Sequence, residues 1–125
     1  MRLQESGEMY LESIYVLSQK NGNVRSIDIS EYMGYSKPSV SRAVSLLKNA
    51  AYITMDEDNY IHLTDTGLEI ARKIYERHTV LSALLVRLGV SEATAAEDAC
   101  RIEHAVSDET FAAIKAHVEN MSEKM

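Results

Sequence analysis

The chain has 125 residues, and 13 lysines and arginines against 19 aspartates and glutamates give a formal net charge of −6. This length favours one domain or a small module with an appendage, and 46% hydrophobic residues argue against wholesale disorder. No apolar run reaches the roughly 20 residues that a membrane helix needs, so a membrane-spanning protein is excluded. With a single cysteine, Cys100, and no charged and then apolar leader, we expect a cytoplasmic protein without an internal disulfide.

Apolar residues spaced by three and four predict helices through the first part of the chain. A first helix is expected from about Gln4 to Ser18, followed by a turn at residues 21–23. A short second helix is expected to begin at Ser26, whose side chain would act as its N-cap, and to end at Gly34.

A third predicted helix and a hairpin follow. Ser36 is the expected N-cap of the helix, and Pro38 suits its first turn because the missing proline N–H has no helical partner there. The predicted buried face of this helix comprises Val40, Ala43, Val44 and Leu47. Aromatic and β-branched runs at residues 52–55 and 59–63, separated by the acidic residues 56–58, indicate a β-hairpin. This order of elements is typical of a winged helix-turn-helix.

Three further helices are predicted in the second half. Thr64 or Thr66 caps a long helix that Gly89 closes. A helix from Ser91 to about Val106 and a last one from Thr110 to near Met121, capped by residues 107–109, complete the chain. The predicted apolar face of the long helix comprises Leu68, Ala71, Tyr75, His78, Leu81, Leu85 and Leu88. We therefore expect a mainly α-helical protein.

The charge is unevenly distributed along the chain. Residues 36–51 contain three basic residues and no acid, so this segment carries +3 and the other 109 residues carry −9. An acidic total argues against a general nucleic-acid coat protein, but a basic third helix with short hydroxyls suits the major groove of DNA. An ordinary solvated face is the alternative, and the acidic hairpin tip predicts a wing that does not grip phosphate. The candidate DNA-binding residues are Arg25, Ser36, Lys37, Pro38, Ser39, Ser41 and Arg42.

Cys100, Glu103 and His104 stand at helical positions i, i+3 and i+4. This spacing places a thiolate, a carboxylate and an imidazole within reach of one cation, and Glu97 is a possible further oxygen ligand. The alternative is a small buried cysteine beside a common surface Glu-His pair.

Other candidate ligands have weaker support from spacing alone. Met9 and Glu12 at i and i+3 of the first helix offer a thioether and a carboxylate, although a methionine on an amphipathic helix is usually a core residue. His78 on an apolar face indicates a core histidine in the absence of other information. His62 and His117 are interpreted as surface residues.

Four stretches, Glu8–Tyr15, Ser36–Ser41, Leu63–Gly67 and Ala99–Asp108, resemble one family over nearly the whole chain. It is the family of metal-dependent repressors typified by the diphtheria toxin repressor and the manganese transport regulator. The resemblance implies a winged helix-turn-helix at residues 1–70 and a helical dimerisation and metal-sensing domain at residues 71–125, without the SH3-like domain of larger members.

The resemblance also implies a ligand set, which comprises Met9, Glu12, His78, Cys100, Glu103 and His104. Met9, Cys100, Glu103 and His104 are similar to the activating site of iron-dependent members, whereas manganese-type members carry carboxylates at the positions of Met9 and Cys100. Ser82 and Ala96 depart from the iron-type second site. Because sulfur donors favour Fe(II), Co(II), Ni(II) or Zn(II) over Mn(II), we expect Fe(II) as the physiological ion and Mn(II) as the next candidate.

The function implied is that of a homodimeric repressor that binds a palindromic double-stranded DNA operator of metal-uptake genes when its metal corepressor is bound. Neither a membrane nor a small-molecule substrate is expected as partner. A redox-responsive regulator using Cys100, a small metalloenzyme, and a metal-buffering or structural dimer are the alternatives. The sequence shows no histidine pair around a general base, no nucleophile elbow and no phosphate loop, and therefore favours a non-enzymatic role.

Overall fold

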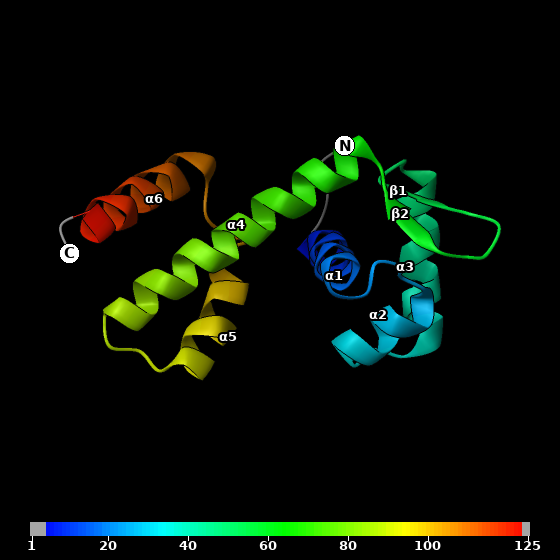
Figure 1. Cartoon of the computed structure of the whole chain (residues 1–125), viewed down its shortest axis with the longest axis horizontal. Coiled ribbons are helices and arrows are strands. Elements are labelled where there is room, and N and C mark those ends of the chain that lie inside the picture. The colour runs from blue at the N-terminus through cyan, green and yellow to red at the C-terminus, as the bar shows by residue number, and fades with distance from the viewer. Residues whose placement is uncertain (1–4, 124–125) are drawn as a thin grey trace. The chain divides into compact units, whose positions relative to one another are not determined.

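The computed structural model describes residues 5–123 and the side chains of residues 6–120. The chain divides into two compact units, Met1–Arg72 and Lys73–Met125. None of the helices described is both long and apolar enough to cross a membrane. The elements, in chain order, are α1 (Glu5–Asn21), α2 (Ser26–Met33), α3 (Lys37–Asn49), β1 (Ile53–Met55), β2 (Ile61–Leu63), α4 (Asp65–Arg87), α5 (Glu92–Ile102) and α6 (Asp108–Glu123) (Figure 1).

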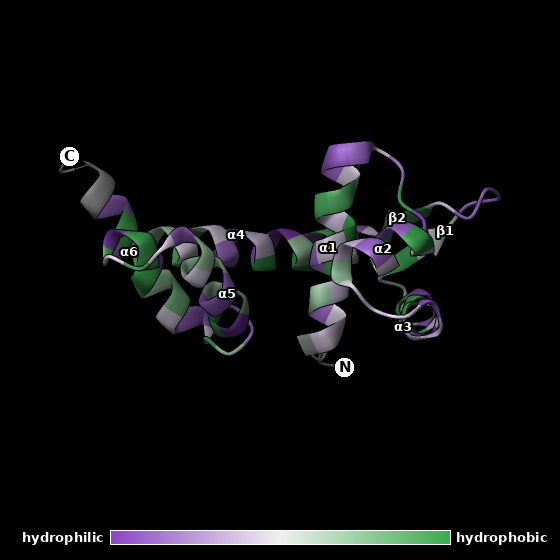
Figure 2. Ribbon diagram, turned by 90° about the horizontal axis from the view of Figure 1, so that it is seen from below, coloured by the Kyte–Doolittle hydropathy of each residue, from purple (hydrophilic) through white to green (hydrophobic). Residues whose placement is uncertain are grey.

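The first unit contains three helices followed by a two-stranded antiparallel hairpin, as the sequence predicts. Ile53 pairs with Leu63 and Met55 with Ile61, which fixes the register of the hairpin. In Figure 2 the loop that joins the strands is hydrophilic, which is expected of an exposed turn. The mainly helical winged helix-turn-helix fold is therefore confirmed.

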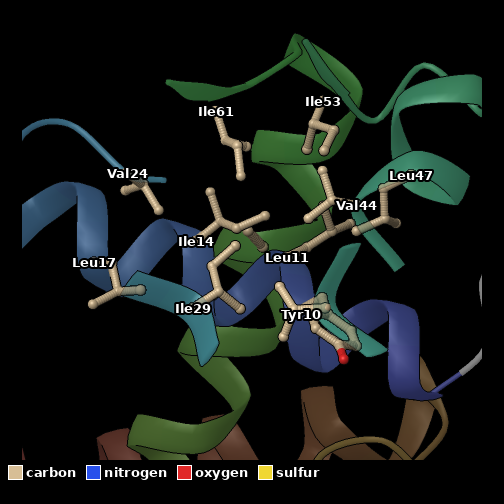
Figure 3. Packing of buried hydrophobic residues seen from close by; sticks show 12 residues of the cluster. Tyr10, Leu11, Ile14, Leu17, Val24, Ile29, Val44, Leu47, Ile53 and Ile61 are labelled. Carbon is tan, nitrogen blue, oxygen red and sulfur yellow. The ribbon is translucent and has the colours of Figure 1, made fainter. Parts of the chain in front are cut away.

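The core of the first unit collects one face from each of these elements. Leu11 and Ile14 of α1 point toward Ile29 of α2 and the strand residues Ile53 and Ile61 (Figure 3). On α3, Val40, Val44 and Leu47 are buried as predicted, while Ala43 is only half-buried. The full cluster comprises Tyr10, Leu11, Ile14, Leu17, Val24, Ile29, Val40, Val44, Leu47, Ile53, Ile61 and Ala71.

The helix ends in this unit confirm two predicted caps and correct two other predictions. Ser36 Oγ accepts a hydrogen bond from the Ser39 amide at 3.3 Å, and Gly34 ends α2 in the left-handed conformation, with φ 73°. The prediction of Ser26 as N-cap was wrong: Arg25 is the N-cap residue, and its amide donates to Asp28 Oδ2 at 2.9 Å. α1 also extends to Asn21, beyond the predicted end at Ser18; its predicted start at Gln4 lies outside the described residues.

The start of α4 depends on Thr64 and on a close backbone approach at Gly67. Thr64 Oγ1 accepts from the Gly67 amide at 3.1 Å and donates to the Ala51 carbonyl at 2.8 Å, so Thr64 rather than Thr66 caps the helix. A Cβ atom at Gly67 would overlap the carbonyl oxygen of Tyr52, which also accepts from the Thr64 amide. Glycine at this position therefore lets the helix start pack against the chain that enters β1.

Gly67→Ala is expected to destabilise the protein by about 1 to 3 kcal/mol, because the added methyl group displaces a hydrogen-bonded backbone carbonyl. This net figure already includes the gain of roughly 1 kcal/mol in helix propensity. Urea unfolding followed by circular dichroism measures the change. Thr66→Ala, at an exposed position of the same turn, is the control and is expected to remain within about 0.5 kcal/mol of the parent.

The second unit has its own small core. Its buried apolar residues are Ile74, Leu81, Ala95, Ala99, Phe111 and Val118. Ser91 caps α5 through a hydrogen bond from the Thr94 amide, and Ser107 Oγ accepts from the Thr110 amide at the start of α6. The positive φ of Gly89, 104°, follows the end of α4 as predicted.

Several predictions for this half were wrong in detail. Tyr75 and Leu88 were expected on the apolar face of α4, but they are 43% and 69% exposed, because the buried face runs through Ile74 and Leu81. α5 ends at Ile102 rather than near Val106, and α6 begins at Asp108 rather than Thr110. Glu103 and His104 consequently lie in the turn after α5.

Candidate nucleic-acid interface and metal centre

The side of α3 opposite its buried stripe is exposed and largely polar, apart from Leu46, which is 71% exposed. Lys37, Ser41 and Arg42 are exposed there, as is Pro38 in the first turn. The absence of an acid in the first turn leaves the positive end of the helix dipole uncompensated. This face has the charge and the short side chains that suit contact with a phosphate backbone.

Ser36 and Ser39 already interact with each other at the start of this helix. The Ser36 hydroxyl donates to Ser39 Oγ at 2.8 Å and accepts from the Ser39 amide. Ser39 is half-buried, whereas Ser36 is exposed. Both residues therefore order the helix end that carries Lys37 and Pro38.

The acidic hairpin tip is built around the carboxylate of Asp56. Its Oδ1 accepts from the amides of Asp58 and Tyr60 at 2.9 and 3.0 Å, and its Oδ2 lies 2.9 Å from His62 Nε2. The His62 hydrogen bond, followed by that of the Tyr60 amide, lowers the pKa of Asp56 from its ordinary value. The Asp56 carboxylate thus closes the turn, and the tip residues 56–58 are exposed. That the wing does not grip phosphate stays a prediction.

Arg25 is exposed beside this hairpin, and its guanidinium lies over a ring that the sequence reasoning did not single out. The Cζ atom is 4.5 Å from the centroid of the Tyr60 ring. An aromatic residue at the neck of a hairpin is a common strand former, so its type alone gives no indication of a partner more than 30 residues away.

The second unit brings Cys100, Glu103 and His104 together. One thiol, one carboxylate and one imidazole ligand atom from these residues all lie within 4.8 Å of one another. α5 positions Cys100, and the αR conformation of Glu103, with φ −58° and ψ −27°, continues the helical direction into the turn. The i, i+3, i+4 spacing therefore holds although the helix ends one residue before Glu103.

Glu103 is the most buried ionisable residue of this cluster, with none of its surface exposed. Its Oε2 lies 2.9 Å from Nδ1 of His78 on α4, and its Oε1 lies 3.3 Å from Nε2 of His104, whose side chain is 1% exposed. His78, interpreted above as a core histidine when spacing alone is considered, is half-buried and faces this carboxylate. Two imidazoles thus flank one buried carboxylate.

This donor set fits a divalent transition metal. A buried carboxylate costs several kcal/mol of free energy unless positive charge compensates it. Metal bonds of about 2.0 to 2.3 Å bring ligand atoms within about 4.5 Å of one another, so a small contraction of the observed cluster would accommodate an ion. Sulfur, nitrogen and oxygen donors together are typical of iron, cobalt, nickel or zinc sites.

Arg77 supports the cluster from α4, and the sequence reasoning did not identify it. Its Nη1 donates to the carbonyls of Glu103 and Val106 at 2.9 and 2.6 Å, and its Nη2 donates to Asp108 Oδ1 at 2.5 Å. The guanidinium also lies 5.4 Å from the Phe111 ring. Arg77 is buried on α4 between the buried residues Ile74 and Leu81. In the sequence it therefore occupies a position spaced like the apolar residues of this helix. A basic residue at such a position is the feature that could have indicated its role.

Lys73 also pairs with Asp108, at 2.7 Å, and this hydrogen bond is the main cause that lowers the pKa of Asp108. The Asp108 carboxylate therefore stabilises the folded state at pH values above its ordinary pKa. This stabilisation is lost as the pH falls through the lowered pKa of the folded protein. The salt bridges fasten the start of α6 to α4.

The other candidate metal ligands and the two histidines interpreted as surface residues lie on α1, β2, α5 and α6. Met9 and Glu12 are half-buried, one turn apart on α1 in the first unit, and their ligand roles stay predictions. Glu97 is exposed on α5, and His117 is exposed on α6. His62 is exposed as expected, but it pairs with Asp56.

Two family models together match residues 2–125. Residues 2–61 match the N-terminal DNA-binding domain of iron-dependent repressors, and residues 64–125 match their metal-binding and dimerisation domain. The resemblance drawn from the sequence motifs is thereby confirmed.

Individual proteins agree with this match. An uncharacterized HTH-type transcriptional regulator of Methanocaldococcus jannaschii is 31% identical over 98% of this chain and 100% of its own length. The transcriptional regulator MntR of Salmonella typhimurium is 35% identical over 86% of this chain and 68% of its own length. The solved manganese regulator SloR matches 95% of this chain with a TM-score of 0.81 at 28% identity. The chain spans 55% of the length of that structure.

Proposed function

Because the chain belongs to the iron-dependent repressor family, we propose that it is a metal-responsive transcriptional repressor. In this proposal residues 1–70 bind double-stranded DNA, and residues 71–125 dimerise and sense the metal. The observation that carries it is the Glu103 carboxylate, buried between His78 and His104 and beside Cys100. The exposed basic side of α3 supports the DNA-binding half of the proposal.

Six residues would hold metal, namely Met9, Glu12, His78, Cys100, Glu103 and His104. A bound divalent cation supplies the positive charge and the directed bonds that compensate the buried carboxylate. Glu103 orients His78 and His104, and Arg77 holds the backbone of Glu103 in place. An ion that binds the DNA-competent conformation more tightly than the other would shift the chain toward that conformation.

The ligand types support Fe(II) as the physiological ion and Mn(II) as the next candidate. A thioether and a thiolate are soft donors, which Mn(II) accepts less readily than Fe(II), Co(II), Ni(II) or Zn(II). Zn(II) is expected to bind more tightly than Fe(II) in vitro, so availability in the cell decides the working ion.

On the DNA side, Arg42 would read a base edge in the major groove. Lys37, Ser41 and Arg25 would contact phosphates, while Ser36, Pro38 and Ser39 order the helix start. A homodimer would place two such helices in successive major grooves of a palindromic operator in the cytoplasm. The role requires no substrate turnover.

The direct test is a titration of anaerobically prepared apo-protein onto DNA. The probe is a labelled duplex selected from a randomised pool in the presence of metal, read by fluorescence anisotropy with and without Fe(II), Mn(II) or Zn(II). We expect metal to raise DNA affinity by about 100-fold, which corresponds to about 2.7 kcal/mol. Arg42→Ala should lose about 1 to 3 kcal/mol of specific binding while it keeps its metal affinity. Equal DNA affinity with and without metal would refute the corepressor role.

Met9→Asp combined with Cys100→Asp is expected to shift the metal response from Fe(II) toward Mn(II), because oxygen ligands replace the two sulfur donors. The measurement compares the concentrations of each ion that give half-maximal DNA binding. Met33→Leu, which replaces a methionine packed in the first unit, is a control for the loss of sulfur. An unchanged metal ranking in the double variant contradicts the ligand assignment.

A further inference from the structure

The backbone at Arg25 is fixed on both sides. The preceding residue, Val24, is buried and forms an isolated antiparallel bridge with Ile61, whose amide donates to the Val24 carbonyl at 2.7 Å. The Arg25 amide itself donates to Asp28 Oδ2 at 2.9 Å. The Cα of Arg25 is therefore tied to the hairpin on one side and to α2 on the other.

The backbone that carries the ring facing Arg25 is also fixed. The Tyr60 amide donates to Asp56 Oδ1 at 3.0 Å, and the Tyr60 carbonyl accepts from the Asp56 amide at 3.1 Å. Tyr60 is half-buried at the neck of the hairpin, directly before β2. Asp56 at the tip thus holds the backbone of Tyr60 in position.

A guanidinium 4.5 Å from a ring centroid lies within the range of a cation–π contact. This contact occupies one side of the guanidinium and leaves the N–H donors that point away from the ring available for a phosphate. An exposed arginine without a ring would have to lose its side-chain freedom on binding DNA. The contact with the Tyr60 ring orders part of the Arg25 side chain before DNA binds.

We propose that Tyr60 is a positioning residue for DNA binding: its ring holds the Arg25 guanidinium ready for one phosphate of the duplex. This inference rests on the proposed function, since it deepens the DNA contact of the same winged helix. The wing then contributes through its neck, while its acidic tip, occupied by the hydrogen bonds of Asp56, stands clear of the backbone.

The test uses the full-length protein with saturating metal and the selected duplex described above. Tyr60→Leu and Arg25→Ala are each expected to weaken binding by about 5-fold. Arg25→Ala, which removes the charge, should also reduce the slope of log affinity against log salt by about 0.9. The double variant should be no weaker than either single variant. Tyr60→Phe should bind like the parent, because it keeps the ring.

Tyr32→Leu is the matched control, since it removes another ring that carries a cation, with Lys20 Nζ 5.9 Å from its centroid. It should leave the affinity and the salt slope unchanged. In the DNA-free protein, the Arg25 side-chain proton resonances should be displaced by the ring current of Tyr60 and should return to ordinary values in Tyr60→Leu. If the leucine variant unfolds, Tyr60→Trp carries the test, because a stronger aromatic face should preserve or tighten binding.

Parent-like binding by Tyr60→Leu would overturn the inference, as would additive losses in the double variant. Weaker binding by Tyr60→Trp would also overturn it. These outcomes leave the repressor proposal intact if Arg42→Ala still binds more weakly and metal still raises affinity. Absence of DNA binding by the parent protein at low salt would instead overturn both.

Discussion

Glu103→Gln is expected to lower metal affinity by about 100-fold or more and to abolish the metal dependence of DNA binding. The substitution keeps the shape of the side chain but removes the charge that would attract a cation between His78, Cys100 and His104. In the absence of metal, the free energy of unfolding should change little, because the amide avoids the desolvation cost of a buried carboxylate but interacts less strongly with His78.

The measurement combines calorimetric titration with Fe(II) or Mn(II) and thermal unfolding with and without metal. At a metal concentration 100 times the Kd, the parent gains about 2.7 kcal/mol, whereas the variant at that concentration gains almost none. Glu97→Gln makes the same change at an exposed position of α5 and should retain most of the gain. Metal affinity within about 3-fold of the parent in Glu103→Gln would contradict the metal site.

Arg77→Met is expected to destabilise the second unit by about 3 to 5 kcal/mol. The methionine fills much of the volume but leaves the carbonyls of Glu103 and Val106 without their guanidinium donor, at about 1 to 3 kcal/mol for each buried group. The salt bridge to Asp108 is lost as well, but Asp108 is largely exposed, so this contributes little. Metal affinity should also fall, since the backbone of Glu103 is no longer held.

Urea unfolding of the metal-free protein measures the loss of stability by itself. A metal titration of the same variant then measures the fall in metal affinity. Arg101→Met, at an exposed position in the last turn of α5, is the matched control and should stay within about 0.5 kcal/mol of the parent. The role assigned to Arg77 fails if its variant unfolds at the same urea midpoint as that control.

The predictions that agreed with the structure depend on residues close together in the sequence. Ser36 caps α3 because an N-cap hydroxyl accepts a hydrogen bond from an amide only three residues ahead. Gly34 ends α2 because a left-handed residue stops a helix without steric cost. The antiparallel pairing of Ile53 with Leu63 follows from two adjacent β-prone runs and a short turn.

The errors occurred where several local patterns were compatible with the same residues. Arg25 and Ser26 both come just before an apolar run. The hydrogen bond from the Arg25 amide to the Asp28 side chain places the N-cap at Arg25. Tyr75 and Leu88 fit a helical stripe as well as Ile74 and Leu81 do, but packing buries only the second pair. In a long helix, residues that follow a regular spacing shift gradually around the helix axis. Which of them are buried therefore depends on the elements that pack against the helix.

The sequence by itself determined the order of the elements, the N-cap of α3 at Ser36, the clustering of Cys100, Glu103 and His104, and the family. Periodicity and capping act over about four residues, and family motifs are read directly from residue order. Only the tertiary structure decided that His78 faces Glu103, that Arg77 holds the turn after α5, and that Tyr60 lies under Arg25. These contacts join residues 25 to 35 positions apart, and their formation depends on how helices and strands pack rather than on any local preference.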